Sequence, residues 1–251
     1  MPTQKPFFIP MQPKNNQSKV QAVTIPIKVA VLIDGGFFIK RYNTLYNQQR
    51  RKSAATVAND ICKLAFKHAG NENLLYRIFY YDCPPIEKRV HNPITNRCVN
   101  FATSELAIFK KELLKELKAK RKVALRLGDL KTSDWQFKPQ VAKDIMRGQK
   151  DVANLEEDDI IYGMQQKGID MKIGIDIVTI ALKKLADKIV LVSGDSDFVP
   201  AAKMARREGI DFILDAMYAP HIDSNLNEHI DGLKSFPLYR KTVHKNEDGN
   251  K

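Results

Sequence analysis

The sequence predicts an α/β fold in which helices cover both faces of a parallel sheet of about five strands, as in a three-layer α/β/α sandwich. Two observations lead to this prediction. Short apolar runs of strand length alternate with longer stretches of helical spacing. In addition, 43% of the 251 residues are hydrophobic, which is enough for a core on each face of the sheet.

The predicted strands are short apolar runs, several of them rich in β-branched residues. They are Val29–Ile33, Leu74–Tyr81, Val123–Leu127, Ile189–Val192 and Asp211–Leu214. Crossovers between parallel strands are right-handed almost without exception, and a doubly wound sheet then favours the order 3-2-1-4-5. In that order the first and fourth strands are neighbours.

The predicted helices have apolar residues spaced to form one buried stripe. They are Ala54–His68, Ser104–Lys120, Leu155–Gln166, Asp176–Ala186, Val199–Glu208 and Asn225–Leu233. Residues 28–240 are expected to form one domain. Residues 1–27 are interpreted as a flexible N-terminal arm and residues 241–251 as a disordered C-terminal tail, because both are polar and lack an apolar pattern.

The formal net charge of +12 indicates a polyanionic partner, and nucleic acid is the commonest one. The alternative is that the excess lysine serves only solubility. Three cysteines without a Cys-x-x-Cys pair support neither a disulfide framework nor a zinc site. With no signal peptide and no apolar run of the roughly 18 residues that a membrane span needs, we expect a cytoplasmic protein without membrane contact.

Carboxylates follow two of the strands that the fold makes neighbours. Asp34 comes directly after the first strand, and Asp195 and Asp197 follow the fourth. Ligands of such sheets bind at the carboxyl ends of strands where the winding reverses. Like charges that meet there favour a cation between them, and Mg²⁺ or Mn²⁺ prefers carboxylate oxygens. The alternative for Asp34 is an ordinary Asp-Gly turn.

Other polar residues are candidates for the same site. Asp176 opens a predicted helix on the edge of its buried stripe, although a helix cap would explain it too. Asp170 would either bind the cation or orient a ligand of it. Asp82 follows the second strand and is expected on the same side of the sheet as Asp34, with a Pro-Pro turn as the alternative. Ser193 would hydrogen-bond a carboxylate or the substrate.

Three segments together resemble NYN-domain proteins, which belong to the PIN-like nuclease superfamily. The segments are Val31–Gly36, Lys167–Asp176 and Val192–Phe198, and the last two resemble the LabA-like bacterial branch. The resemblance spans roughly residues 28–235. It implies a PIN-like fold, RNA as the substrate, Mg²⁺ or Mn²⁺ as the cofactor, and four residues as catalytic and metal-binding carboxylates. By position these are Asp34, Asp176, Asp195 and Asp197.

One position departs from the family pattern. Many relatives have an asparagine about three residues after the first aspartate, where this chain has Phe37. In those relatives the asparagine helps to hold the pocket. Some LabA-like proteins, moreover, are regulators rather than nucleases.

The sequence therefore predicts a divalent-metal-dependent ribonuclease that hydrolyses RNA phosphodiester bonds. One alternative is a non-catalytic RNA-binding or regulatory protein that keeps the acidic pocket. A weaker alternative is a metal-dependent phosphatase, although the Asp-x-Asp that haloacid dehalogenase-like enzymes use after strand one is absent.

Basic residues near the predicted crevice would bind the phosphates of single-stranded or structured RNA. They are Lys40, Arg41, Lys88, Arg89, Arg206 and Arg207. A homodimer is one further option, because exposed helices are available for pairing.

Overall fold

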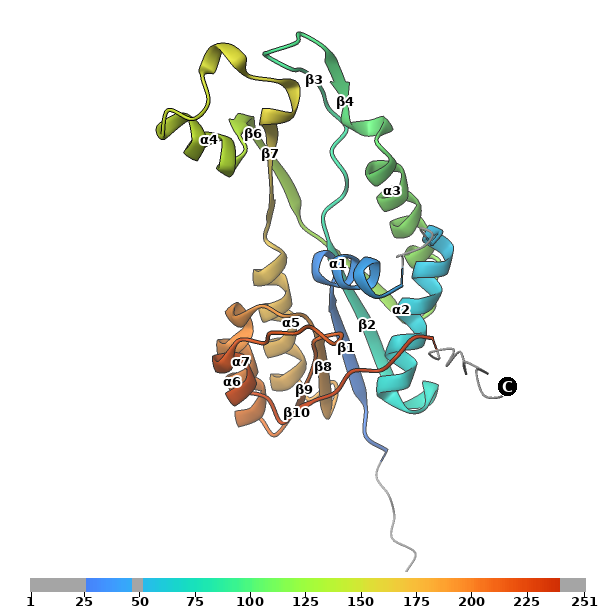
Figure 1. Cartoon of the computed structure of the whole chain (residues 1–251). Helices are drawn as coiled ribbons and strands as arrows, with labels where there is room; N and C mark the ends of the chain where they lie inside the picture. The colour runs from blue at the N-terminus through green and yellow to red at the C-terminus, as the bar shows by residue number, and fades with distance from the viewer. Residues whose placement is uncertain (1–25, 47–51, 240–251) are drawn as a thin grey trace, which may run out of the picture.

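The computed structural model of the chain describes residues 26–46 and 52–239. Its centre is a six-stranded parallel sheet with the order β10-β9-β8-β1-β2-β5 (Figure 1). The strands are β1 (Val29–Asp34), β2 (Leu75–Asp82), β5 (Val123–Leu127), β8 (Lys188–Val192), β9 (Asp211–Asp215) and β10 (Gly232–Leu233). The expected α/β class and the order of the five predicted strands are confirmed, and β10 adds a short sixth strand at the edge.

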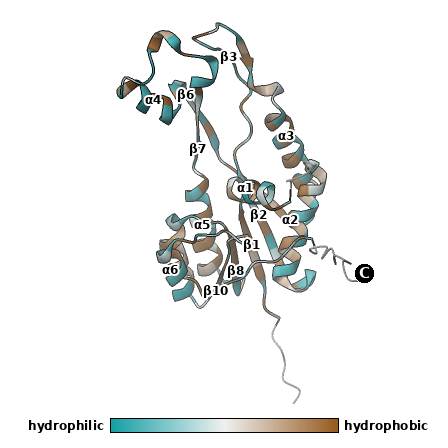
Figure 2. Cartoon of the chain, viewed as in Figure 1, coloured by the Kyte–Doolittle hydropathy of each residue, from teal (hydrophilic) through white to brown (hydrophobic). Residues whose placement is uncertain are grey.

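Helices cover both faces of this sheet (Figure 1). On one face lie α1 (Gly35–Tyr46), α2 (Ala54–Ala69) and α3 (Glu105–Lys118). On the other lie α5 (Ile169–Leu182), α6 (Val199–Arg207) and α7 (Ser224–Glu228). Because side chains alternate along a strand, Val31 and Ile33 pack toward α1–α3, whereas Ala30 and Leu32 pack toward α5 and α6. The helices beside the sheet carry both hydrophobic and hydrophilic residues (Figure 2).

A projection extends beyond the carboxyl ends of the strands (Figure 1). We call residues 88–101 and 129–167 the arm. It contains the hairpin β3 (Arg89–His91) and β4 (Cys98–Asn100), the ribbon β6 (Asp129–Phe137) and β7 (Ile160–Lys167), and α4 (Pro139–Met146). The hairpin and the ribbon meet at Tyr162, whose ring stacks on Phe101 at 5.3 Å and whose hydroxyl accepts a 2.7 Å hydrogen bond from Lys88.

Short 3-10 turns complete the described chain. They are η1 (Glu72–Leu74), η2 (Phe101–Thr103), η3 (Val152–Asn154), η4 (Glu157–Asp159) and η5 (Ser196–Phe198). The predicted helix Leu155–Gln166 is wrong, because this segment forms η4 and most of β7. Ile160 and Tyr162 are buried while Ile161 between them is exposed, which is the two-residue period of a strand.

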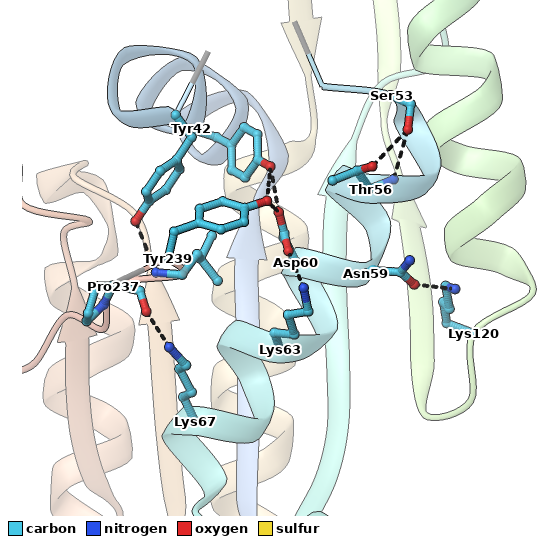
Figure 3. A network of polar contacts seen from close by, with 12 residues as sticks. Tyr42, Ser53, Thr56, Asn59, Asp60, Lys63, Lys67, Lys120, Pro237 and Tyr239 are labelled. Atoms are coloured by element: carbon cyan, nitrogen blue, oxygen red, sulfur yellow. Dashed lines mark hydrogen bonds and ion pairs between the residues drawn. The ribbon is translucent and has the colours of Figure 1, made fainter. Parts of the chain in front are cut away.

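The segment before residue 240 is fastened across α1 and α2 through a buried carboxylate (Figure 3). Asp60 of α2 is fully buried and accepts hydrogen bonds from the hydroxyls of Tyr42 and Tyr239, and from Lys63 at 3.0 Å. The Tyr46 hydroxyl accepts a 3.2 Å bond from the backbone N–H of Leu238. The C-terminal segment thereby holds α1 in place at the end of β1.

The predicted N-terminal arm, residues 1–27, lies outside the described residues except for its last two, and the predicted tail, 241–251, lies outside them entirely. Within the described part of the chain, no helix is both long and apolar enough to cross a membrane.

Candidate functional site

The parallel register of the sheet brings the two acidic segments to one edge. Ile33 of β1 is paired with Val192 of β8, so that Asp34 and Ser193 follow neighbouring strands at the same level. Asp195 and Asp197 lie in the turn directly beyond Ser193, before α6. These residues are about 160 positions apart in the sequence, and only the strand order unites them.

Asp34 is the last residue of β1 and directly precedes α1. Its Oδ1 accepts a 3.1 Å hydrogen bond from the backbone N–H of Phe37. The pKa of Asp34 is raised, mainly because burial disfavours the carboxylate, and the charges of Asp170 and Asp82 add to this effect. Gly35 must be glycine here, since a Cβ would come within 2.6 Å of the Tyr81 carbonyl oxygen.

Asp170 occupies the first turn of α5, between Asp34 and the turn after β8. Its pKa is raised first by burial and then by the charges of Asp195 and Asp197. Asp170 is therefore close enough to both acidic segments to couple with them electrostatically. The structure thus places it among the candidate carboxylates rather than behind them.

The turn after β8 is held by its own side chains. Asp195 donates its backbone N–H to the hydroxyl of the fully buried Ser193 at 3.3 Å, and its Oδ1 accepts from the N–H of Asp197 at 3.0 Å. Asp195, not Asp197, therefore caps the following turn. Both carboxylates are exposed, which leaves their remaining oxygens open to a ligand.

Phe37 occupies the position where the family pattern has asparagine. Its ring packs against Gly194, where a Cβ would come within 2.7 Å of it. The departure at residue 37 is thus matched by a glycine in the facing turn, and the ring fills space between the two acidic segments.

The structure separates Asp176 from the other candidates. Its Oδ2 accepts a 2.8 Å hydrogen bond from the Tyr81 hydroxyl and forms a 2.8 Å ion pair with Arg126. It lies six residues beyond Asp170, which corresponds to about 9 Å along the helix axis. The reason is that α5 begins at Ile169, earlier than expected, so Asp176 lies about two turns into the helix rather than at its start.

Asp82 lies at the same carboxyl edge as Asp34, close enough for its charge to raise the pKa of Asp34. The register pairs Asp34 with Tyr81, and the next residue of the strand points to the α3 side. There Asp82 is buried, and its Oδ1 accepts a 2.6 Å bond from Lys110 and a 3.5 Å bond from Gln166. Its Oδ2 and the Tyr80 hydroxyl are both buried, and burial together with the Asp82 charge holds the pKa of Tyr80 well above its ordinary value.

The predicted phosphate-binding residues are scattered. Arg41 donates to the backbone carbonyls of Met217 and Tyr218, and Lys88 bonds Tyr162 in the arm. Arg206 and Arg207 end α6, which runs back from the acidic edge, so they lie at the amino end of β9 instead. Lys40 and Arg89 are exposed at the carboxyl side of the sheet.

The donor set fits a hard divalent cation of the kind that the sequence predicts. Within residues 26–46 and 52–239, no three His, Cys, Asp or Glu side chains lie close enough to hold an ion as they stand. Mg²⁺ usually needs only one or two carboxylates and keeps water and phosphate as its other ligands. Burial and neighbouring carboxylates raise the pKa values of Asp34 and Asp170, and a cation at this edge would offset that effect.

Sequence reasoning missed the contribution of Lys110 and Gln166. Lys110 lies in a lysine-rich helix, and Gln166 lies in a segment whose pattern predicts a helix. Nothing in the local pattern distinguishes either residue. The available signal is Asp82, a polar residue that directly follows a predicted strand, because both residues contact it.

Comparison with known proteins gives one family match. The model of the NYN domain matches residues 93–232, more than half of the chain. The match includes Asp170, Asp176, Asp195 and Asp197 and begins after Asp34 and Asp82. No curated protein matches the chain. A solved structure of a protein of unknown function from Vibrio parahaemolyticus RIMD 2210633 is 13% identical, with 84% of this chain and 94% of that chain covered and a TM-score of 0.42.

Proposed function

The chain belongs to the NYN-domain family, a family of PIN-like nucleases, and from this premise we propose that it is a divalent-metal-dependent ribonuclease. The substrate would be single-stranded or structured RNA, and the cofactor Mg²⁺ or Mn²⁺. We also propose that the chain belongs to the LabA-like branch, because the acidic segments around Asp170 and Asp195 resemble that branch.

One observation carries the proposal. Carboxylates from three separate segments lie at the carboxyl edge of the sheet, at Asp34, at Asp170 and at Asp195 with Asp197. The charge of Asp170 raises the pKa of Asp34, and the charges of Asp195 and Asp197 raise the pKa of Asp170. Such an arrangement stabilises a cation and is costly without one. A purely structural role gives no reason to assemble like charges there.

In this mechanism, carboxylates from the set Asp34, Asp170, Asp195 and Asp197 would hold the cation together with water, while Asp82 is paired with Lys110. The bound cation would lower the pKa of a water molecule and neutralise charge on the scissile phosphate. Ser193 orients the turn that carries Asp195. The role of Asp176 is to position α5 against β2 and β5 through Tyr81 and Arg126.

The domain boundaries at 28 and 240 are also part of the proposal, as is a cytoplasmic location. Cys62, Cys83 and Cys98 are all free thiols, which suits a reducing compartment.

The test is cleavage of a 5′-labelled RNA by the purified chain in Mn²⁺, with and without EDTA. We expect cleavage that EDTA abolishes and that Asp195→Asn reduces by at least about a hundredfold. The matched control is Asp134→Asn, an exposed aspartate of the arm, which should cut like wild type.

The second candidate function is an RNA-binding regulator without catalysis. It is favoured by the open spacing of the carboxylates, no three of which converge as the described side chains stand. Binding of RNA without cleavage in Mg²⁺, Mn²⁺ or Ca²⁺ would replace the nuclease proposal with this one. Release of inorganic phosphate from small esters, without RNA cleavage, would contradict both.

A further inference from the structure

A cavity of about 280 Å³ lies between α3, the linker after β2 and the ribbon of the arm. Most of its wall is apolar, with Ile86, Phe101, Leu106, Leu130 and Met164 contributing side chains. Leu106 and Met164 are 53% and 41% exposed, so the cavity opens to solvent between them.

The polar end of the cavity is shared with the acidic edge. Lys110 and Gln166 line the cavity, and both also contact Asp82, at 2.6 Å and 3.5 Å. A ligand in the cavity would therefore lie next to the buried Asp82, whose charge also acts on Asp34.

We propose that this cavity binds a single unstacked nucleobase of the strand whose phosphate lies at the acidic edge. The inference rests on the proposed function and adds a subsite to it. Apolar walls with one aromatic ring suit the faces of a base, and the Gln166 amide supplies both a donor and an acceptor for its edge. The volume is below the roughly 300–1,000 Å³ of sites for larger ligands, which favours one ring system over a whole nucleotide.

Charge favours a nucleic-acid strand over an apolar peptide as the occupant. Lys110 stands between the cavity and the acidic edge, where it pairs with Asp82 at 2.6 Å. A phosphate beside an inserted base would lie near this ammonium group, whereas an apolar peptide would gain only the apolar contact.

The experiment measures binding of a fluorescent ten-nucleotide single-stranded RNA in Mn²⁺ by anisotropy, with cleavage monitored on a gel. A second set of strands carries one abasic residue, moved along the sequence. The cavity variant is Leu106→Gln with Met164→Gln. Its matched control is Ile108→Gln with Ile161→Gln, which removes equally exposed apolar side chains from α3 and β7 outside the cavity.

We expect the cavity variant to bind the natural strand about tenfold more weakly, in line with the loss of one base contact. The control pair should bind like wild type. An abasic residue at one position should weaken binding to wild type to a similar extent and should have no further effect on the cavity variant. Thermal unfolding of both pairs verifies that they fold.

Three outcomes overturn the inference in distinguishable ways. If wild type cuts RNA but the cavity and control pairs bind all strands alike, the cavity holds no base and the proposed function is unaffected. If wild type neither binds nor cuts any strand, the proposed function fails and the subsite fails with it. Capture of an apolar peptide by the wild type, lost in the cavity variant only, also overturns it.

Discussion

Asp34 and Asp170 are harder to ionise in the folded chain than in the unfolded one. Burial is the main cause for each, and neighbouring carboxylates add to it. The fold therefore carries an electrostatic cost at its acidic edge. Functional sites commonly carry such a cost, and a bound cation would offset it.

This cost predicts a pH-dependent stability of the metal-free protein. The folded pKa of Asp34 is raised above its ordinary value of 3.8, so its contribution to stability is fully present below that value and is lost as pH rises through the folded pKa. Asp34→Asn removes the titration while its side-chain oxygen still accepts the Phe37 N–H.

We expect the metal-free Asp34→Asn variant to melt at a higher temperature than wild type at pH 7 and to lose this advantage toward pH 3. Thermal unfolding in EDTA across this range measures the effect, with Asp134→Asn as the control. Excess Mn²⁺ should reverse the order, since it binds wild type more tightly. If wild type remains more stable than Asp34→Asn at pH 7 in EDTA, the buried Asp34 carboxylate carries no net electrostatic cost.

Asp170 and Asp176 provide a second residue-level prediction, because the sequence favoured Asp176 and the geometry favours Asp170. We expect Asp170→Asn to weaken Mn²⁺ binding at least about tenfold by calorimetry, since it removes a charge at the acidic edge. We expect Asp176→Asn to leave Mn²⁺ affinity nearly unchanged. It should instead lower the free energy of unfolding by about 1–3 kcal/mol, because the partly buried pair with Arg126 loses its charge.

The opposite pattern, with affinity lost only in Asp176→Asn, would restore the assignment that the sequence alone suggested. Equal losses in both variants would mean that α5 moves as a unit on binding.

The arm joins the sheet through one tight crossing of backbone segments. Gly128 lies between β5 and β6, where a Cβ would come within 2.6 Å of the Lys167 carbonyl oxygen and 2.8 Å of Ile169. Lys167 ends β7 and Ile169 begins α5. The contact therefore fixes both the direction of the ribbon and the start of the helix that carries Asp170.

We expect Gly128→Ala to destabilise the chain by about 1–3 kcal/mol, because a backbone atom cannot yield as a flexible side chain can. Mn²⁺ affinity should fall as well, since Asp170 shifts with α5. Gly174→Ala, in α5, is the matched control. A Cβ at residue 174 meets nothing within 4 Å, so this substitution should stabilise the chain by about 0.5–1 kcal/mol through helix propensity. Denaturant unfolding measures both, and equal effects would show that the crossing is not tight in solution.

The chain as a whole shows which parts of a fold its local patterns determine. The strand order follows from apolar runs and from the handedness of crossovers, and so does the placement of Asp34 and Asp195 at the same edge of the sheet. The arm was not predictable in this way. Every residue of β6 is exposed or half-buried, and the arm depends on long-range contacts such as that of Phe101 with Tyr162.

The misplaced helix start at α5 has a local cause. Gly168 precedes the helix in a left-handed conformation, with φ of 79°, and offers no side-chain cap. The sequence therefore lacks the usual Ser, Thr, Asp or Asn signal, and Asp176 looked like the helix start instead. This one shift decides which aspartate of α5 reaches the acidic edge.

The distribution of basic residues predicts where RNA runs across the molecule. Lys88 and Arg89 lie at the base of the arm, on the carboxyl side of the sheet, whereas Arg206 and Arg207 lie at the opposite end of the sheet, where Arg206 pairs with Asp231.

We expect Lys88→Gln with Arg89→Gln to reduce the slope of log affinity against log salt by roughly 1.4 for single-stranded RNA, which corresponds to two lost phosphate contacts. Arg206→Gln with Arg207→Gln has the same change in net charge and should leave the slope unchanged. Fluorescence titrations between 50 and about 200 mM salt measure the slope. If both pairs reduce it equally, the overall charge of the chain attracts RNA without a defined path, and the carboxyl side of the sheet has no privileged role in binding.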